Sequence, residues 1–71
     1  MDIIVSGFGK RSLSMQISLY DSDESSSVFR AVCGPDVEVF FELSGEFEVW
    51  DIVSAAADSF RVEFDLLGEE F

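Results

Sequence analysis

Apolar and polar residues alternate along several stretches of the chain, and each such stretch predicts a half-buried strand. The clearest is 12–20, SLSMQISLY, in which one face is wholly apolar and the other carries serine, glutamine and Tyr20. Successive side chains on a strand point to opposite faces, so this pattern is typical of a strand with one face on a core. The short β-branched run 2–8 predicts a second strand, joined to the first by a hairpin connection at 9–11.

A third strand is predicted over 37–43, VEVFFEL, with Glu38, Phe40 and Glu42 on its polar face. The segment before it, 28–33, is short and apolar, and its pattern fits either a strand or one turn of helix. A Gly-Pro-Asp sequence at 34–36 ends that segment in a turn.

The stretch 44–59 is compatible with two structures. As the second strand of a hairpin, it would set two glutamates opposite each other. As a helix, it would use Ser44 as the N-cap and place Glu46 and Glu48 in the first turn, where the helix dipole favours acids. The apolar stripe of that helix would consist of Phe47, Trp50, Val53 or Ser54, Ala57 and Phe60. The three alanines at 55–57 favour a helix over 45–59, because alanine is the best helix former.

The last alternating stretch, 61–67, predicts one more strand, with Glu63 and Asp65 on its polar face. Together these elements predict an α+β fold, a mostly antiparallel sheet of about four strands with one helix packed on one face. A chain of 71 residues has no room for a second core, so 1–71 is expected to form a single domain.

Composition supports a folded core but offers no covalent or metal support for it. Apolar residues make up 48% of the chain and include eight Phe, too many for a disordered acidic tail. A single cysteine excludes an internal disulfide, and the absence of histidine excludes the usual zinc sites. Residues expected in the core are Cys33, Phe41, Phe47, Trp50, Phe60 and Phe64.

The sequence shows no pattern of catalysis. Without histidine, the commonest general base is missing, and Lys10 and Ser12 lie in a predicted turn. The run 7–12 resembles a phosphate loop only in its glycines and precedes a strand instead of a helix. The loop 21–27 begins like a calcium loop but lacks the required glycine and glutamate, which leaves open a weak surface cation site. We therefore expect no enzyme, no cofactor and no metal centre.

The chain also lacks a basic leader and any apolar run long enough to span a membrane. With a lone cysteine as well, it is expected in the cytoplasm.

Charge is the strongest functional signal in the sequence. Four bases and fifteen acids give a formal charge of −11, which destabilises a compact domain through self-repulsion. Nucleic acid and anionic membranes carry the same sign and are the least suitable partners, whereas a basic protein surface or a saline environment would account for the acid. Phe40, between two glutamates, is either an exposed contact residue or is covered by 28–33. The residues predicted to bind a partner are Glu38, Phe40, Glu42, Glu46, Glu48, Asp51, Glu63 and Asp65.

In length, charge and pattern the chain resembles the small acidic DNA-mimic inhibitors of phages and mobile elements, of anti-CRISPR or anti-restriction type. The features in common are the −11 charge and the alternating stretches VEVFFEL and FRVEFDLL. The resemblance implies a stoichiometric inhibitor that occupies a basic nucleic-acid-binding surface, such as that of a CRISPR effector or nuclease, in the host cytoplasm. Two alternatives stay open: an immunity or antitoxin protein for a basic toxin, and a small domain of a halophile. A homodimer is compatible with each.

Overall fold

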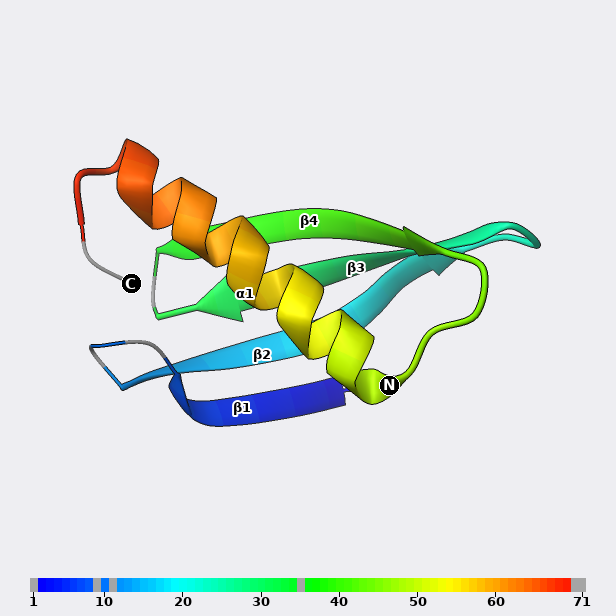
Figure 1. Ribbon diagram of the computed structural model, residues 1–71, viewed down its shortest axis with the longest axis horizontal. Helices are drawn as coiled ribbons and strands as arrows, with labels where there is room; N and C mark the ends of the chain where they lie inside the picture. The colour runs from blue at the N-terminus through cyan, green and yellow to red at the C-terminus, as the bar shows by residue number, and fades with distance from the viewer. Residues whose placement is uncertain (1, 9, 11, 35, 70–71) are drawn as a thin grey trace.

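The computed structural model describes residues 2–8, 10, 12–34 and 36–69. It contains four strands followed by one helix: β1 (Asp2–Phe8), β2 (Leu13–Ser22), β3 (Ser26–Cys33), β4 (Val37–Ser44) and α1 (Val49–Leu66). The strands form one sheet in the order β1-β2-β3-β4, each antiparallel to the next (Figure 1). This arrangement confirms the predicted α+β fold with a single helix on an antiparallel sheet.

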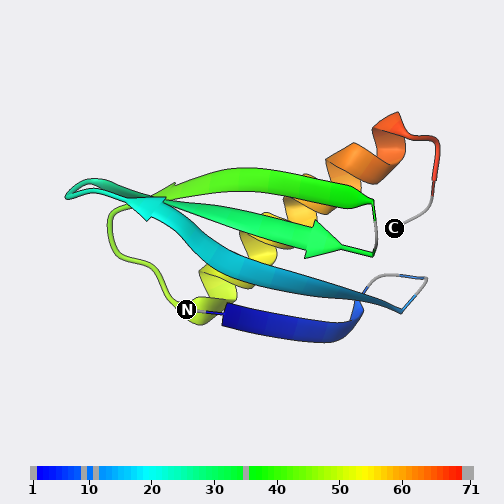
Figure 2. The same cartoon turned by 180° about the vertical axis from the view of Figure 1, so that it is seen from behind.

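The molecule has two layers, and only one face of the sheet is covered. Helix α1 runs diagonally across that face, from the β1 side to the β4 side (Figure 1). Seen from behind, no element of the described residues lies over the sheet, so its second face is open (Figure 2). Within the described part of the chain, no helix has the length and apolar character needed to cross a membrane.

The ambiguous segment 28–33 is a strand, and it is central to the sheet. β3 begins at Ser26 and pairs with β2 on one side and β4 on the other. Three of its residues point toward the helix and are buried: Phe29, Ala31 and Cys33. The alternate residues Val28, Arg30 and Val32 lie on the other face and are only partly buried.

The helix begins later than predicted. Ser44 is the last residue of β4, paired with Ser26, so it is not the N-cap. Gly45 follows with φ +73°, a left-handed conformation that ends the strand and that glycine adopts without strain. The N-cap is Glu48, whose backbone is extended, and the helix starts at Val49. Phe47, just before the cap, packs edge-to-face on Phe29 with ring centroids 5.7 Å apart, which holds the connection against the core.

The strand predicted over 61–67 is wrong, because α1 continues through it to Leu66. No glycine or proline interrupts the chain between Gly45 and Gly68, and each further helical residue adds a hydrogen bond at little cost. Phe60 and Phe64 are buried at a spacing of four residues, whereas Val62 and Leu66, predicted to face inward with them, are 61% and 79% exposed. Helical packing therefore overrides the two-residue alternation.

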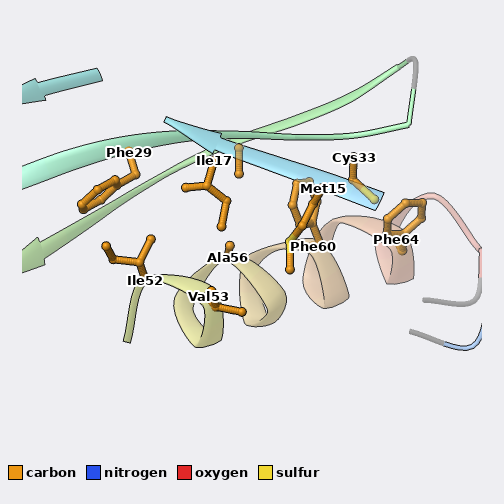
Figure 3. Packing of buried hydrophobic residues seen from close by; sticks show 10 residues of the cluster. Met15, Ile17, Phe29, Cys33, Ile52, Val53, Ala56, Phe60 and Phe64 are labelled. Carbon is orange, nitrogen blue, oxygen red and sulfur yellow. The ribbon is translucent and has the colours of Figure 1, made fainter. Parts of the chain in front are cut away.

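The core lies between the covered face and α1. Its buried residues come from β2, β3 and the helix, and Figure 3 shows their side chains meeting between the layers: Met15, Ile17, Phe29, Ala31, Cys33, Ile52, Val53, Ala56, Phe60 and Phe64. The predicted burial of Cys33, Phe60 and Phe64 is confirmed, and Phe41 and Phe47 pack partly buried against the cluster. Trp50 is 72% exposed, so its predicted place in the core is wrong. It precedes Ile52 by two residues, and residues at that spacing do not share a helix face.

Candidate interaction surface

The residues predicted to bind a partner fall into three places. Glu38, Phe40 and Glu42 lie side by side on the open face of β4, where alternation had placed them. Three more surround the start of α1: Glu46, Glu48 and Asp51. The last two, Glu63 and Asp65, belong to the helix and not to the open face of the sheet, so the prediction that they lie on the polar face of a strand is wrong.

Phe40 forms an aromatic pair with Tyr20 on the open face. Its ring is 49% exposed and meets the ring of Tyr20, which is 65% exposed, edge to face at a centroid distance of 5.0 Å. β3 lies beside Phe40 in the sheet and does not cover it, so the alternative in which 28–33 covers this ring is wrong. Tyr20 sits where the register between β2 and β3 shifts, between Leu19 and Asp21. Tyr20 was not among the residues predicted to bind a partner. The alternation of 12–20 places it on the polar face, and this is the sequence feature that indicated its exposure.

One arginine modifies the charge of this surface. Arg30 on β3 lies directly opposite Phe40, and its Nε donates a hydrogen bond to Oε2 of Glu38, forming an ion pair. Among the described residues, Glu42 receives only a hydroxyl hydrogen bond, from Ser26 Oγ at 3.2 Å. Of the two open-face glutamates on β4, Glu42 therefore carries a charge that no described base offsets, while Glu38 is paired with Arg30 in a half-exposed ion pair. Sequence reasoning missed Arg30 because the conformation of 28–33 was undecided.

The acids at the start of α1 have a structural role. The backbone N–H of Glu48 donates to Oδ2 of Asp51 at 2.8 Å, which satisfies a group just before the helix. Both carboxylates also lie where the positive end of the helix dipole favours them. Together with Gly45, Glu46 and Phe47, they line a shallow hollow. These contacts explain the presence of acidic residues at positions 48 and 51 without a binding partner.

The helix carries its remaining acids on two different flanks. Asp65 is exposed on the outer face together with Asp51 and Asp58, at steps of seven residues, or about 10.5 Å at the helical rise. Arg61 Nη1 lies 3.6 Å from Oδ1 of Asp58 in the middle of this row. Glu63 instead faces the β4 side, where it lines an open hollow with Glu38, Val39, Phe40, Ser59 and Val62. Only Glu63 is therefore near the open-face residues of β4.

The connection between β2 and β3 holds one carboxylate with an altered pKa. The backbone N–H groups of Ser25 and Ser26 each donate to Oδ1 of Asp23 at 2.8 Å, and they hold the pKa of Asp23 below its ordinary value of 3.8. Asp23 thus closes the hairpin connection with hydrogen bonds to its own neighbours. Among the described residues, no group of three or more His, Cys, Asp or Glu side chains could hold a metal ion.

Comparison with known proteins adds no relative to this description. No protein-family model, no curated protein and no solved structure matches the chain. The functional argument therefore rests on the surface itself, an open sheet face on which Glu38 and Glu42 flank an exposed aromatic pair.

Proposed function

We propose that this protein is a small acidic interaction protein that binds the basic, nucleic-acid-binding surface of another protein and blocks it. The observation that carries the proposal is Phe40, a half-exposed ring packed on Tyr20 and flanked by Glu38 and Glu42 on an uncovered sheet face. Aromatic residues inside a polar rim are the usual energetic centres of interfaces. A basic partner fits the surrounding acid and the net charge of −11.

Nucleic-acid-binding surfaces supply the matching chemistry. They present Lys and Arg side chains that neutralise phosphates, together with aromatic or apolar positions that contact bases. An acidic surface with a rigid aromatic pair engages both kinds of group at once. A protein bound in this way excludes nucleic acid because the same cations serve both ligands.

Displacement from immobilised DNA tests the proposal. A lysate of cells that encode the protein is loaded onto DNA-cellulose at low salt, and the purified chain is added as the eluent. We expect one or a few DNA-binding proteins to be released by the wild-type chain. A variant with Phe40→Ala and Glu42→Lys is expected to need at least about tenfold more protein for the same release, the loss typical of an interface centre.

A variant with Trp50→Ala and Asp58→Lys is the matched control. It also removes an exposed aromatic ring and reverses one acid, but on α1, away from the open face. It is expected to release the same proteins as the wild type. Equal loss in both variants would contradict the placement of the surface, and release of no DNA-binding protein would contradict the function.

A further inference from the structure

The two edges of the sheet differ in regularity. β1 pairs with β2 in register only from Asp2 to Val5, and its register shifts before Phe8, at Gly7 with φ +71°. β4 pairs with β3 through eight consecutive residues, from Val37 to Ser44, without a shift. Bulges, prolines and charged side chains, lysine above all, are the usual devices that prevent an edge from pairing with another chain. β1 has the bulge, whereas β4 has no bulge, proline or lysine, and its charged side chains are Glu38 and Glu42, which disfavour an acidic strand and favour a basic one.

The outer side of β4 presents free backbone groups. In an antiparallel sheet, alternate residues of an edge strand turn their N–H and C=O away from the neighbouring strand. The backbone hydrogen bonds outside regular elements, taken over the described residues, involve the β2–β3 connection and the two ends of α1, and none of them reaches β4. The edge is therefore competent to accept one more strand.

Helix α1 extends over the place that such a strand would occupy. The helix makes most of its contacts with β4, and its last turns cross the outer edge of β4 and pass beyond it (Figures 1 and 2). Val62 and Leu66 in these turns are 61% and 79% exposed, because no described element covers them. Val62 also lines the open hollow between α1 and β4. These apolar side chains on the helix would cover the inner face of an added strand.

We propose that the outer edge of β4 binds an extended basic segment of the partner protein as a fifth strand of the sheet. This inference rests on the proposed function and specifies how the partner is held. Strand addition supplies affinity through main-chain hydrogen bonds and specificity through alternate side chains.

The side chains around the edge define the sequence that fits. On the open face, the added strand would lie beside Glu38, Phe40 and Glu42. Its residues opposite the two glutamates are expected to be basic, and the residue opposite Phe40 is expected to be apolar or aromatic. On the other face, the intervening residues would meet Val39, Val62 and Leu66, which matches aliphatic side chains. The partner segment therefore alternates basic or aromatic residues with aliphatic ones.

A second copy of this chain fits the edge less well than a basic segment. Residues opposite each other in a sheet share a face, so a symmetric antiparallel pairing centred on Phe40 sets Glu38 opposite Glu42 twice. Like charges in opposite positions destabilise a sheet. Pairing two chains that each carry −11 adds repulsion between the rest of their surfaces. A basic strand avoids both the like-charge pairs across the edge and the repulsion between two acidic chains.

A synthetic peptide tests the inference. The probe is an acetylated and amidated nine-residue peptide with Lys, Tyr and Arg at alternate central positions and Val between them; a scrambled peptide of the same composition is the control. We expect the probe to bind and to slow hydrogen exchange at alternate amides of β4, with no change in β1. Glu42→Gln should weaken binding by several-fold, since one interfacial charge is lost.

Two N-methylated peptides separate strand addition from charge attraction. One is methylated on the Lys, Tyr and Arg nitrogens, and the other on the Val nitrogens. Only one set of N–H groups can face β4, so one peptide should lose at least about tenfold in affinity and the other should bind like the probe. Equal binding of the two peptides, protection at β1, no binding, or a dimer of the free chain joined at β4 would each overturn the inference.

The result is separable from the proposed function. If the chain displaces DNA-binding proteins from DNA but β4 gains no protection in the complex, the function stands and this mode of binding is wrong. If the peptide adds to β4 but no DNA-binding protein is displaced, the strand acceptor stands and the proposed target class is wrong.

Discussion

At the residue scale, exposure separates the aromatic residues that build the core from those left for contact. Phe60 is fully buried at the centre of the helix stripe, while Phe40, Tyr20 and Trp50 are half or more exposed. Tyr20 and Phe40 pack edge to face, which restricts the motion of both rings in the free protein. An ordered ring loses little conformational entropy on binding, which makes this pair a better anchor than the isolated Trp50.

Trp50 and Phe60 should respond oppositely to truncation. Phe60→Ala is expected to cost about 3–5 kcal/mol of unfolding free energy, because it leaves a cavity in the core. Trp50→Ala should change the unfolding free energy by less than about 0.5 kcal/mol, as is usual for exposed side chains. Denaturant titration followed by circular dichroism measures both. Since Trp50 is the only tryptophan, its fluorescence in the wild type should also be fully accessible to acrylamide; a protected signal would contradict the exposed position.

Asp23 should titrate at a lower pH than an ordinary aspartate. Its folded pKa lies below 3.8 because the Ser25 and Ser26 N–H groups stabilise the carboxylate. A carboxyl with a lowered folded pKa contributes stability that is present above its unfolded pKa and is lost as the pH falls through the folded value. The contribution of Asp23 should therefore be intact at pH 5 and disappear in the range below about 3.8. Carboxyl chemical shifts from NMR give the midpoint directly, and a midpoint at or above 3.8 would contradict the hydrogen bonding.

At the element scale, the sequence predicted the strands with alternating faces and misjudged the helix. Alternation placed Met15 and Ile17 inward and Phe40 outward, because each strand has one solvated face. The run 60–66 satisfies both a two-residue and a four-residue period, and so short a run cannot distinguish them. The run is helical because Phe60 and Phe64 then pack into the same core cluster as Ile52, Val53 and Ala56, and this packing is a tertiary interaction. The pairing of Glu63 with Glu38 around one hollow followed from that helix and was not predictable from spacing.

The two ends of α1 should respond oppositely to removal of an acid. Asp51→Ala removes the carboxylate that accepts from Glu48 N–H near the positive end of the dipole, and should cost about 1 kcal/mol. Asp65→Ala removes an acid from the last turn, where the dipole disfavours it, and should be neutral or stabilising by up to about 0.5 kcal/mol. Each change removes one negative charge, so the pair controls for net charge. Thermal and denaturant melts of the two variants supply the comparison; equal effects would show that the cap is not formed.

At the scale of the whole molecule, unbalanced charge dominates. Arg30 and Arg61 each form an ion pair with an acid. The remaining carboxylates are spread over the sheet, the connections and the helix. Such a surface repels itself when free and is relieved by a basic partner. The apolar core and continuous hydrogen-bonded sheet hold the fold against this repulsion.

Salt should therefore stabilise the free chain and weaken its complex. Raising NaCl from about 0.01 to 0.15 M shortens the Debye length from about 30 to 8 Å, which screens self-repulsion and raises the melting temperature. The chain should nevertheless be folded at the lower concentration, and melts across this range show whether it is. A chain unfolded at about 0.01 M salt would favour the halophile alternative.

Mutual exclusion of the protein and nucleic acid on one target is the most direct test of the account. A DNA-binding protein released from DNA-cellulose is purified, bound to a labelled duplex and titrated with the chain by native gel electrophoresis and light scattering. We predict that free duplex and a DNA-free complex of chain and target appear together. The apparent Kd of the target for the duplex should rise linearly with the concentration of free chain. A stable ternary complex of target, duplex and chain would contradict the claim that this acidic surface occupies the site of nucleic acid.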